Sequence, residues 1–169
     1  MIKSSKEQFS LIYDQYIEKI YRFIYLKVDS QETAEDITSK VFLKGLEAYQ
    51  KDQEINNPGA FLYQIARNTI IDHYRENDRT KKISTEFTGE IVDPKTNLYE
   101  KAVLNESIET TKLAIQNLKK DYQDVIIWHY LEDMPIAEIA EILNKPVGTV
   151  RVMIHRGLKS LKDELIQQA

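Results

Sequence analysis

The chain contains no cysteine, and only five of its 169 residues are glycine and four are proline. The lack of cysteine excludes disulfide frameworks, thiolate metal sites and cysteine nucleophiles. So few glycines and prolines, with 42% hydrophobic residues, are typical of a folded, helix-rich chain. No apolar run approaches the roughly 20 residues that span a bilayer, and the first residues lack the apolar core of a secretory signal. We therefore expect a cytoplasmic protein without membrane insertion.

Residues that could support catalysis or bind a metal are scattered. His73, His129 and His155 lie far apart in the sequence, and no metal-binding motif accompanies them. The adjacent acids Glu35-Asp36 and Glu132-Asp133 would point in different directions on a helix, which makes them poor catalytic pairs. There is also no glycine-rich phosphate loop. The sequence predicts neither an enzyme nor a metal or other cofactor.

The formal net charge of −4 hides an uneven distribution of charge. Residues 28–54 hold seven acids (Asp29, Glu32, Glu35, Asp36, Glu47, Asp52 and Glu54) against three lysines. Residues 147–162 hold four cations (Arg151, Arg156, Lys159 and Lys162) and no acid. An acidic and a basic surface on one molecule suggest two different partners.

A helix-turn-helix pattern occupies the C-terminal part of the chain. A short helix is predicted by the apolar spacing of Ile136, Ile139, Ala140 and Leu143. Asn144-Lys145-Pro146 ends it, because proline disfavours helical geometry in the residue before it. The inward stripe of the next helix is Val150, Ile154, Leu158, Leu161 and Leu165, and its outer side carries Arg151, Val152, His155, Arg156, Lys159 and Lys162. Such a second helix enters the DNA major groove; a surface hairpin with a solvated face is the alternative.

Three longer helices are expected in the N-terminal part, over about residues 7–28, 32–49 and 57–77. Their inward residues should be Phe9, Ile12, Tyr16, Ile20, Phe23, Ile24, Ala34, Ile37, Val41, Phe42, Leu62, Ile65, Ala66, Thr69 and Ile70. Residues 79–97 are polar and without period, as in a flexible linker between domains. The sequence therefore predicts an all-α fold of two small helical domains, 1–78 and 98–169.

Two separated motif blocks resemble conserved regions of the sigma-70 family. Region 2 is resembled by residues 34–37 (Ala-Glu-Asp-Ile), 41–44 (Val-Phe-Leu-Lys), 61–68 (Phe-Leu-Tyr-Gln-Ile-Ala-Arg-Asn) and 72–75 (Asp-His-Tyr-Arg). Region 4 is resembled by residues 138–140 (Glu-Ile-Ala), 147–151 (Val-Gly-Thr-Val-Arg) and 155–156 (His-Arg). The blocks lie in the family's order, with no room for region 3 between them. That arrangement is similar to an extracytoplasmic-function (ECF) sigma factor.

The resemblance implies a surface that binds core RNA polymerase and two that bind promoter DNA. The core-binding residues would be Asp36, Ser39, Lys40, Leu43 and Glu47, docking on the β′ clamp helices. The −10 element would be read by Asn57, Phe61, Gln64, Arg67, Asn68, Ile71 and Arg75. The −35 element would be read by Thr149, Arg151, Val152, His155, Arg156 and Lys159. The β flap of the polymerase and an anti-sigma factor are the further partners that the resemblance implies.

The residue types agree with these roles, although a simpler explanation exists for each. An exposed leucine among charges, such as Leu43, suits a protein contact, yet a solvated face would look the same. Amide, cationic and aromatic groups suit single-stranded DNA, whereas the alternative is core aromatics beside a charged helix end. On the last helix, Arg156 can contact a guanine edge or a phosphate and Val152 a thymine methyl; Arg156 could instead pair with Glu138 or Glu141.

The chain departs from the usual family pattern at four places, one of which is Leu118-Lys119, where Leu-Pro often opens region 4. Phe61 stands where tryptophan is frequent, Ser39-Lys40 where Gln-Glu is frequent, and Val152-Met153 where Ser-Arg is frequent. The base preference of the last helix is therefore not predictable. Two other functions stay open on the residues alone: a free-standing, dimeric helix-turn-helix regulator with a sensing or dimerising N-terminal part, and an interaction module without a DNA role.

Overall fold

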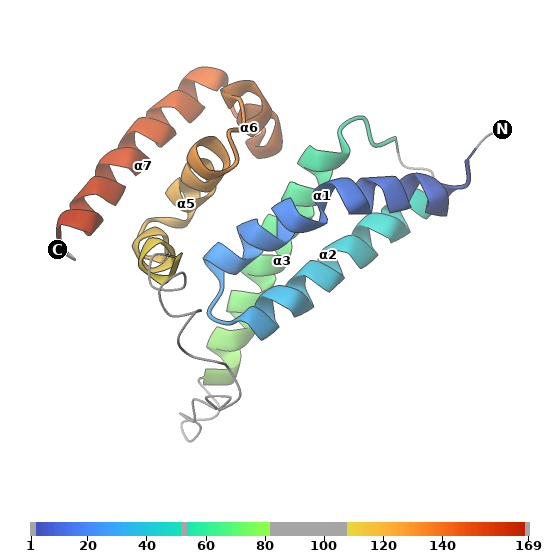
Figure 1. The fold of residues 1–169 in the computed structure, drawn as a ribbon, viewed down its shortest axis with the longest axis horizontal. Coiled ribbons are helices and arrows are strands. Elements are labelled where there is room, and N and C mark those ends of the chain that lie inside the picture. Colours follow the sequence, from blue (N-terminus) through green and yellow to red (C-terminus); the bar gives the residue numbers. More distant parts are fainter. Residues whose placement is uncertain (1–2, 52–53, 82–107, 168–169) are drawn as a thin grey trace.

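Helices make up the structure of the chain, a computed structural model that describes residues 3–51, 54–81 and 108–167. The helices are α1 (Ser5–Lys27), α2 (Gln31–Gln50), α3 (Pro58–Lys81), a helical segment over 108–116, α5 (Lys120–Ile126), the π-helical turn η1 (Ile127–Leu131), α6 (Ile136–Leu143) and α7 (Val147–Gln167). Figure 1 shows α1–α3 as one group and α5–α7 as a second group beside it. The predicted all-α fold is confirmed, and no helix in these ranges is long and apolar enough to cross a membrane.

Side-chain caps explain where the first three helices begin. Ser4 and Glu7 form a reciprocal capping box at α1, and the Ser30 hydroxyl accepts the backbone N–H of Thr33 at α2. At α3 the Asn57 side chain accepts the N–H of Ala60 at 3.1 Å, and Pro58 occupies the first helical position. The predicted helix start at Asn57-Pro58 is therefore confirmed. The helix ends later than predicted, at Lys81, and the rest of the predicted linker lies outside the described residues.

The N-terminal group has the core that the apolar spacing predicts. The most buried predicted side chains are Phe9, Ile20, Phe23, Ile24, Ala34, Ile37, Val41, Phe42, Leu62, Ala66, Thr69 and Ile70. Gly45 lets α2 approach its neighbours, because a Cβ there would lie 3.0 Å from Leu62 Cδ2 and 3.2 Å from Phe9 Cζ. The three helices therefore form one tightly packed bundle.

The turn between α6 and α7 is closed by an asparagine in the left-handed conformation. Asn144 has φ 53° and ψ 48°, and the N–H of Lys145 donates to the carbonyl of Ala140 at 3.0 Å. This is the hydrogen bond of a left-handed helix cap, so Asn144 ends α6 and Pro146 only prevents its continuation. Val150 and Ile154 are buried as predicted, but Leu165 is 45% exposed. Its predicted burial is wrong, because the inward stripe of α7 ends at Leu161, the last partly buried apolar residue that packs on the core.

An aromatic cluster joins the two groups of helices. Trp128 of η1 is fully buried and stacks on Phe23 of α1, with ring centroids 5.2 Å apart and planes inclined by 10°. The rings of Tyr63 on α3 and Trp128 are arranged edge to face, with their centroids 5.5 Å apart. The sequence predicts two separate cores and does not predict this contact. The cores are continuous because α5 and η1 lie between α7 on one side and α1 and α3 on the other (Figure 1).

Candidate nucleic-acid and protein interfaces

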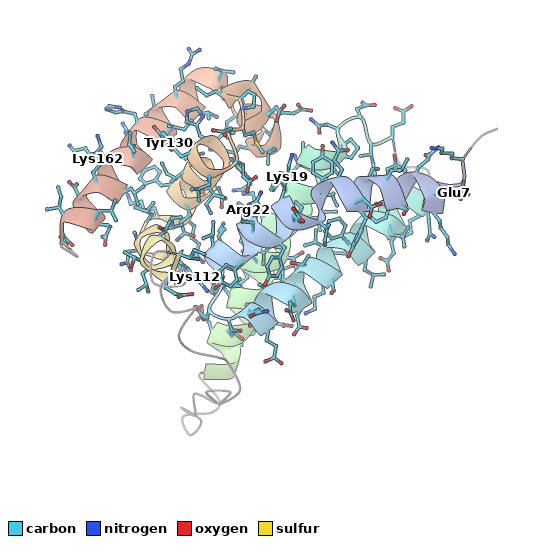
Figure 2. The ribbon with its side chains drawn as sticks, viewed as in Figure 1. Glu7, Lys19, Arg22, Lys112, Tyr130 and Lys162 are labelled. Atoms are coloured by element: carbon cyan, nitrogen blue, oxygen red, sulfur yellow. The ribbon has the colours of Figure 1, made fainter. Side chains whose placement is uncertain are left out.

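The outer face of α7 presents its predicted residues to solvent. Thr149, Arg151, Val152, His155, Arg156 and Lys159 are all exposed. Figure 2 shows Lys162 on the outer side of the same helix, directed away from the N-terminal group. No ion pair joins Arg156 to Glu138 or Glu141 in the described part of the chain. A basic, unobstructed second helix of a helix-turn-helix is therefore free to enter a DNA groove.

The predicted polymerase-binding residues form one exposed face of α2. Asp36, Ser39, Lys40, Leu43 and Glu47 all lie at the surface, and the Leu43 side chain is 57% exposed. Leu43 borders an apolar groove between α1 and α2 that also includes Phe42 and the exposed ring of Tyr13. The rings of Tyr13 and Phe42 are arranged edge to face, with their centroids 4.9 Å apart. Tyr13 is not among the residues predicted from the sequence, although an aromatic residue outside the inward stripe of α1 is a usable signal.

The predicted −10 residues lie on α3 or at its start, but they are not equally accessible. Asn68 and Arg75 are exposed, while Phe61 and Ile71 are half-buried. Asn57, Gln64 and Arg67 each donate a hydrogen bond to the C-terminal group of helices, although Gln64 stays exposed. Their partners are the Glu141 carboxylate at 3.1 Å, the Ile142 carbonyl at 3.1 Å and the Asp124 carboxylate at 2.8 Å, respectively.

Asp124 of α5 is the centre of a buried charge cluster. Its carboxylate pairs with Lys27 at the end of α1 and with Arg67 on α3, and these side chains are 3%, 7% and 25% exposed in that order. The Lys27 ammonium also lies 5.0 Å from the centre of the Phe23 ring. Beside the cluster, the Tyr74 hydroxyl donates to the Lys27 carbonyl, and burial raises the pKa of Tyr74 to about 12. Tyr74 therefore stays a hydrogen-bond donor at neutral pH.

A second ion pair closes the exposed edge of the contact. Arg22 of α1 donates two hydrogen bonds to Glu132, at 2.6 and 2.9 Å, and this pairing raises the pKa of Arg22. Figure 2 shows Arg22 on the side of α1 that faces the C-terminal helices. No local pattern predicts this pair, because the residues are 110 positions apart.

These features define an all-helical DNA-binding protein with a helix-turn-helix. Sequence models of two family regions match it in order: "Sigma-70 region 2" over residues 12–80 and "Sigma-70, region 4" over residues 109–161. The chain is 31% identical over 175 residues to the ECF RNA polymerase sigma factor SigW of Bacillus subtilis, covering 96% of this chain and 91% of that protein. The chain thus belongs to the ECF group of the sigma-70 family of RNA polymerase sigma factors.

Other similar proteins agree with this family. The ECF RNA polymerase sigma factor BldN of Streptomyces coelicolor is 31% identical over 164 residues, and the match covers 92% of this chain but only 59% of BldN. CnrH, solved in complex with the cytosolic domain of CnrY, has a TM-score of 0.73 and 15% identity, covering 97% of this chain and 91% of CnrH. RpoE of Bartonella quintana, solved with the anti-sigma factor NepR, has a TM-score of 0.72 and 18% identity, covering 94% of this chain and 97% of RpoE. At these identities the structures show that the fold is shared.

Proposed function

We propose that this chain binds core RNA polymerase and gives it promoter specificity, using α2 for the polymerase, α3 for the −10 element and α7 for the −35 element. The observation that carries the proposal is the separation of an exposed acidic face on α2 from an exposed basic face on α7. The acidic face of α2 would repel the phosphates of DNA, and the basic face of α7 would bind them.

The residues proposed for each surface are those that the resemblance implies. On α2 they are Asp36, Ser39, Lys40, Leu43 and Glu47, for the β′ clamp helices; on α7 they are Thr149, Arg151, Val152, His155, Arg156 and Lys159. On α3 and its cap they are Asn57, Phe61, Gln64, Arg67, Asn68, Ile71 and Arg75. We add Tyr13 to the polymerase surface, because its exposed ring lies in the same groove as Leu43.

Run-off transcription with reconstituted polymerase tests the proposal. Core enzyme, the chain and a set of genomic fragments should yield discrete transcripts that core enzyme alone does not yield. Binding to purified core polymerase separates this function from that of a free-standing helix-turn-helix regulator. Such a regulator would bind duplex DNA without polymerase and would not bind the core enzyme. That result would refute the proposal.

The setting of the protein is part of the same proposal. A partner of polymerase works in the cytoplasm, and it needs neither a cofactor nor a catalytic residue of its own. An anti-sigma factor is a proposed further partner, since RpoE was solved in complex with the anti-sigma factor NepR. The proposed domains are 1–78 and 98–169, joined by residues 79–97, although α3 continues to Lys81.

A further inference from the structure

A polar cavity lies between α1, the start of α3 and the loop that joins η1 to α6. Its volume is about 340 Å³, which is in the range of small-molecule sites in proteins. Three carboxylates line it, those of Glu132, Asp133 and Glu138, and the only cation of the lining is Lys19. Figure 2 shows Lys19 along the side of α1 that faces the C-terminal helices. The charge of the walls therefore favours a cationic ligand.

Two of the three carboxylates have no counter-charge within the chain. Glu132 is paired with Arg22 through two hydrogen bonds, and its side chain is 5% exposed. Asp133 and Glu138 take part in no ion pair in the described ranges. Asp133 precedes α6 and Glu138 lies in its first turn, so the two charges stand on separate parts of the wall. Lys19 can balance at most one of them.

The hydroxyl of Tyr63 gives an independent indication of a ligand. Tyr63 is 2% exposed and lines the cavity, and its hydroxyl has no hydrogen-bond partner among the described residues. Burial, and after it the charge of Glu132, raises the pKa of Tyr63, with a smaller contribution from Glu138. Since both carboxylates line the cavity, the hydroxyl faces it. A buried polar group normally has a partner, and this oxygen can accept a hydrogen bond from an ammonium group.

The backbone beside the cavity is fixed in a conformation that is rare for residues other than glycine. Asp133 has φ 50° and follows the π-helical turn η1 closely. The N–H of Met134 donates to the carbonyl of Trp128 at 2.9 Å, and this bond closes the turn. Left-handed residues and π-helical turns are both frequent at functional sites. The loop thus holds the Asp133 carboxylate in place before any ligand binds.

We propose that this cavity binds a short aliphatic diamine. Each ammonium group pairs with one of the two free carboxylates, Asp133 and Glu138, and the Tyr63 hydroxyl accepts a further hydrogen bond. Tyr16 supplies an aromatic wall, and the Lys19 ammonium already lies 5.8 Å from the centre of its ring. The inference goes beyond the proposed function and does not depend on it.

Isothermal titration calorimetry of the full chain with a diaminobutane that carries its amines at the two ends tests the inference. We expect saturable binding of one molecule per chain, at an ionic strength kept constant with potassium chloride. Butylamine should bind at least about tenfold more weakly, because it lacks one charged hydrogen-bonding group, and butanediol should not bind. Absence of saturable diaminobutane binding would overturn the inference. Equal affinity for butylamine would also overturn it, because the site would then suit the single ammonium of a partner's lysine.

Charge substitutions locate the binding site. Asp133→Asn removes a carboxylate and keeps the left-handed backbone, which asparagine tolerates, and it should bind diaminobutane at least about tenfold more weakly. Asp163→Asn, the same change at an exposed position of α7, is the matched control and should bind like the wild type. Lys19→Gln should bind more tightly, because it removes the competing cation. Unchanged affinity in Asp133→Asn, or an equal loss in Asp163→Asn, would place the diamine elsewhere and overturn the inference.

Tyr63→Phe tests the hydroxyl separately. Removal of an unpaired buried hydroxyl should raise the melting temperature of the free chain and yet lower its affinity for diaminobutane. A hydroxyl without a ligand would give the first change alone, and that result would overturn the inference. If Asp133→Asn loses helicity, Glu138→Gln replaces it, since Glu138 is exposed on α6. All these measurements omit polymerase and DNA, so failure of the proposed function would leave their outcome unaffected.

Discussion

Asp124→Asn should separate the two helical groups without unfolding either one. The substitution keeps the shape of the side chain but leaves Lys27, whose side chain is 7% exposed, without a counter-charge. Breaking a buried ion pair by removing one partner costs about 3–5 kcal/mol. Arg67 adds less, because its side chain is 25% exposed and water screens its lost interaction. A cost of about 3 kcal/mol shifts an equilibrium by roughly a hundredfold toward the separated groups.

Fluorescence of Trp128 measures this separation in the intact chain. Its indole is fully buried between Phe23 and Tyr63, so parting should move its emission to the red and raise quenching by acrylamide. Asp121→Asn is the matched control, because Asp121 lies on the same helix, is exposed and carries no ion pair in the described residues. Circular dichroism should show unchanged helicity in both variants. Equal quenching of Trp128 in Asp124→Asn and in the wild type would refute the predicted separation, as would a loss of helical signal together with the Trp128 shift.

Four other substitutions test the assigned surfaces and the packing of α7. Leu43→Asp should weaken binding to core polymerase at least tenfold while helicity is kept, because surface changes usually cost within about 0.5 kcal/mol; unchanged affinity would remove Leu43 from the interface. Arg156→Ala should weaken binding of the matched −35 duplex by about 1–3 kcal/mol and spare −10 melting; equal affinity of mutant and wild type would exclude the contact. Gly148→Ala, whose Cβ would meet nothing within 4 Å, should raise stability by about 0.4–1 kcal/mol, and Gly157→Ala should gain less, since its Cβ would lie 3.2 Å from Ile126 Cγ1. Thermal denaturation showing the opposite order would contradict the packing at Gly157.

Local signals in the sequence predict the helices and their exposed faces well. Asn57-Pro58 predicts the start of α3 because capping depends on a few neighbouring atoms, and helical period places Leu43 and Arg156 outside. The same period overestimates the length of the buried stripe on α7. Leu165 fits the stripe, but no helix covers it in the described chain. Period tells which side of a helix is buried and not how far its partner extends.

The contact between the groups could not be predicted in the same way. Lys27, Arg67 and Asp124 are far apart in the sequence, and each alone is typical of a solvated helix. One signal is available: the run from Val125 to Leu131 contains a single polar residue, His129, which indicates a helix covered on more than one face. This signal does not identify the helices that cover it. The motif that predicts a DNA contact for Arg67 therefore does not predict its ion pair with Asp124.

The ion pairs between the groups link the shape of the chain to dissolved salt. While the two helical groups are packed together, Lys27, Arg67 and Arg22 are paired with Asp124 and Glu132, so these charges attract fewer ions from solution than free charges do. When the groups part, each freed charge gathers counterions, and opening takes up salt. Binding to a promoter does the reverse, because cations on the protein displace the counterions of the phosphates. The two steps thus respond to ionic strength in opposite directions, and the salt concentration at which transcription is greatest marks the balance between them.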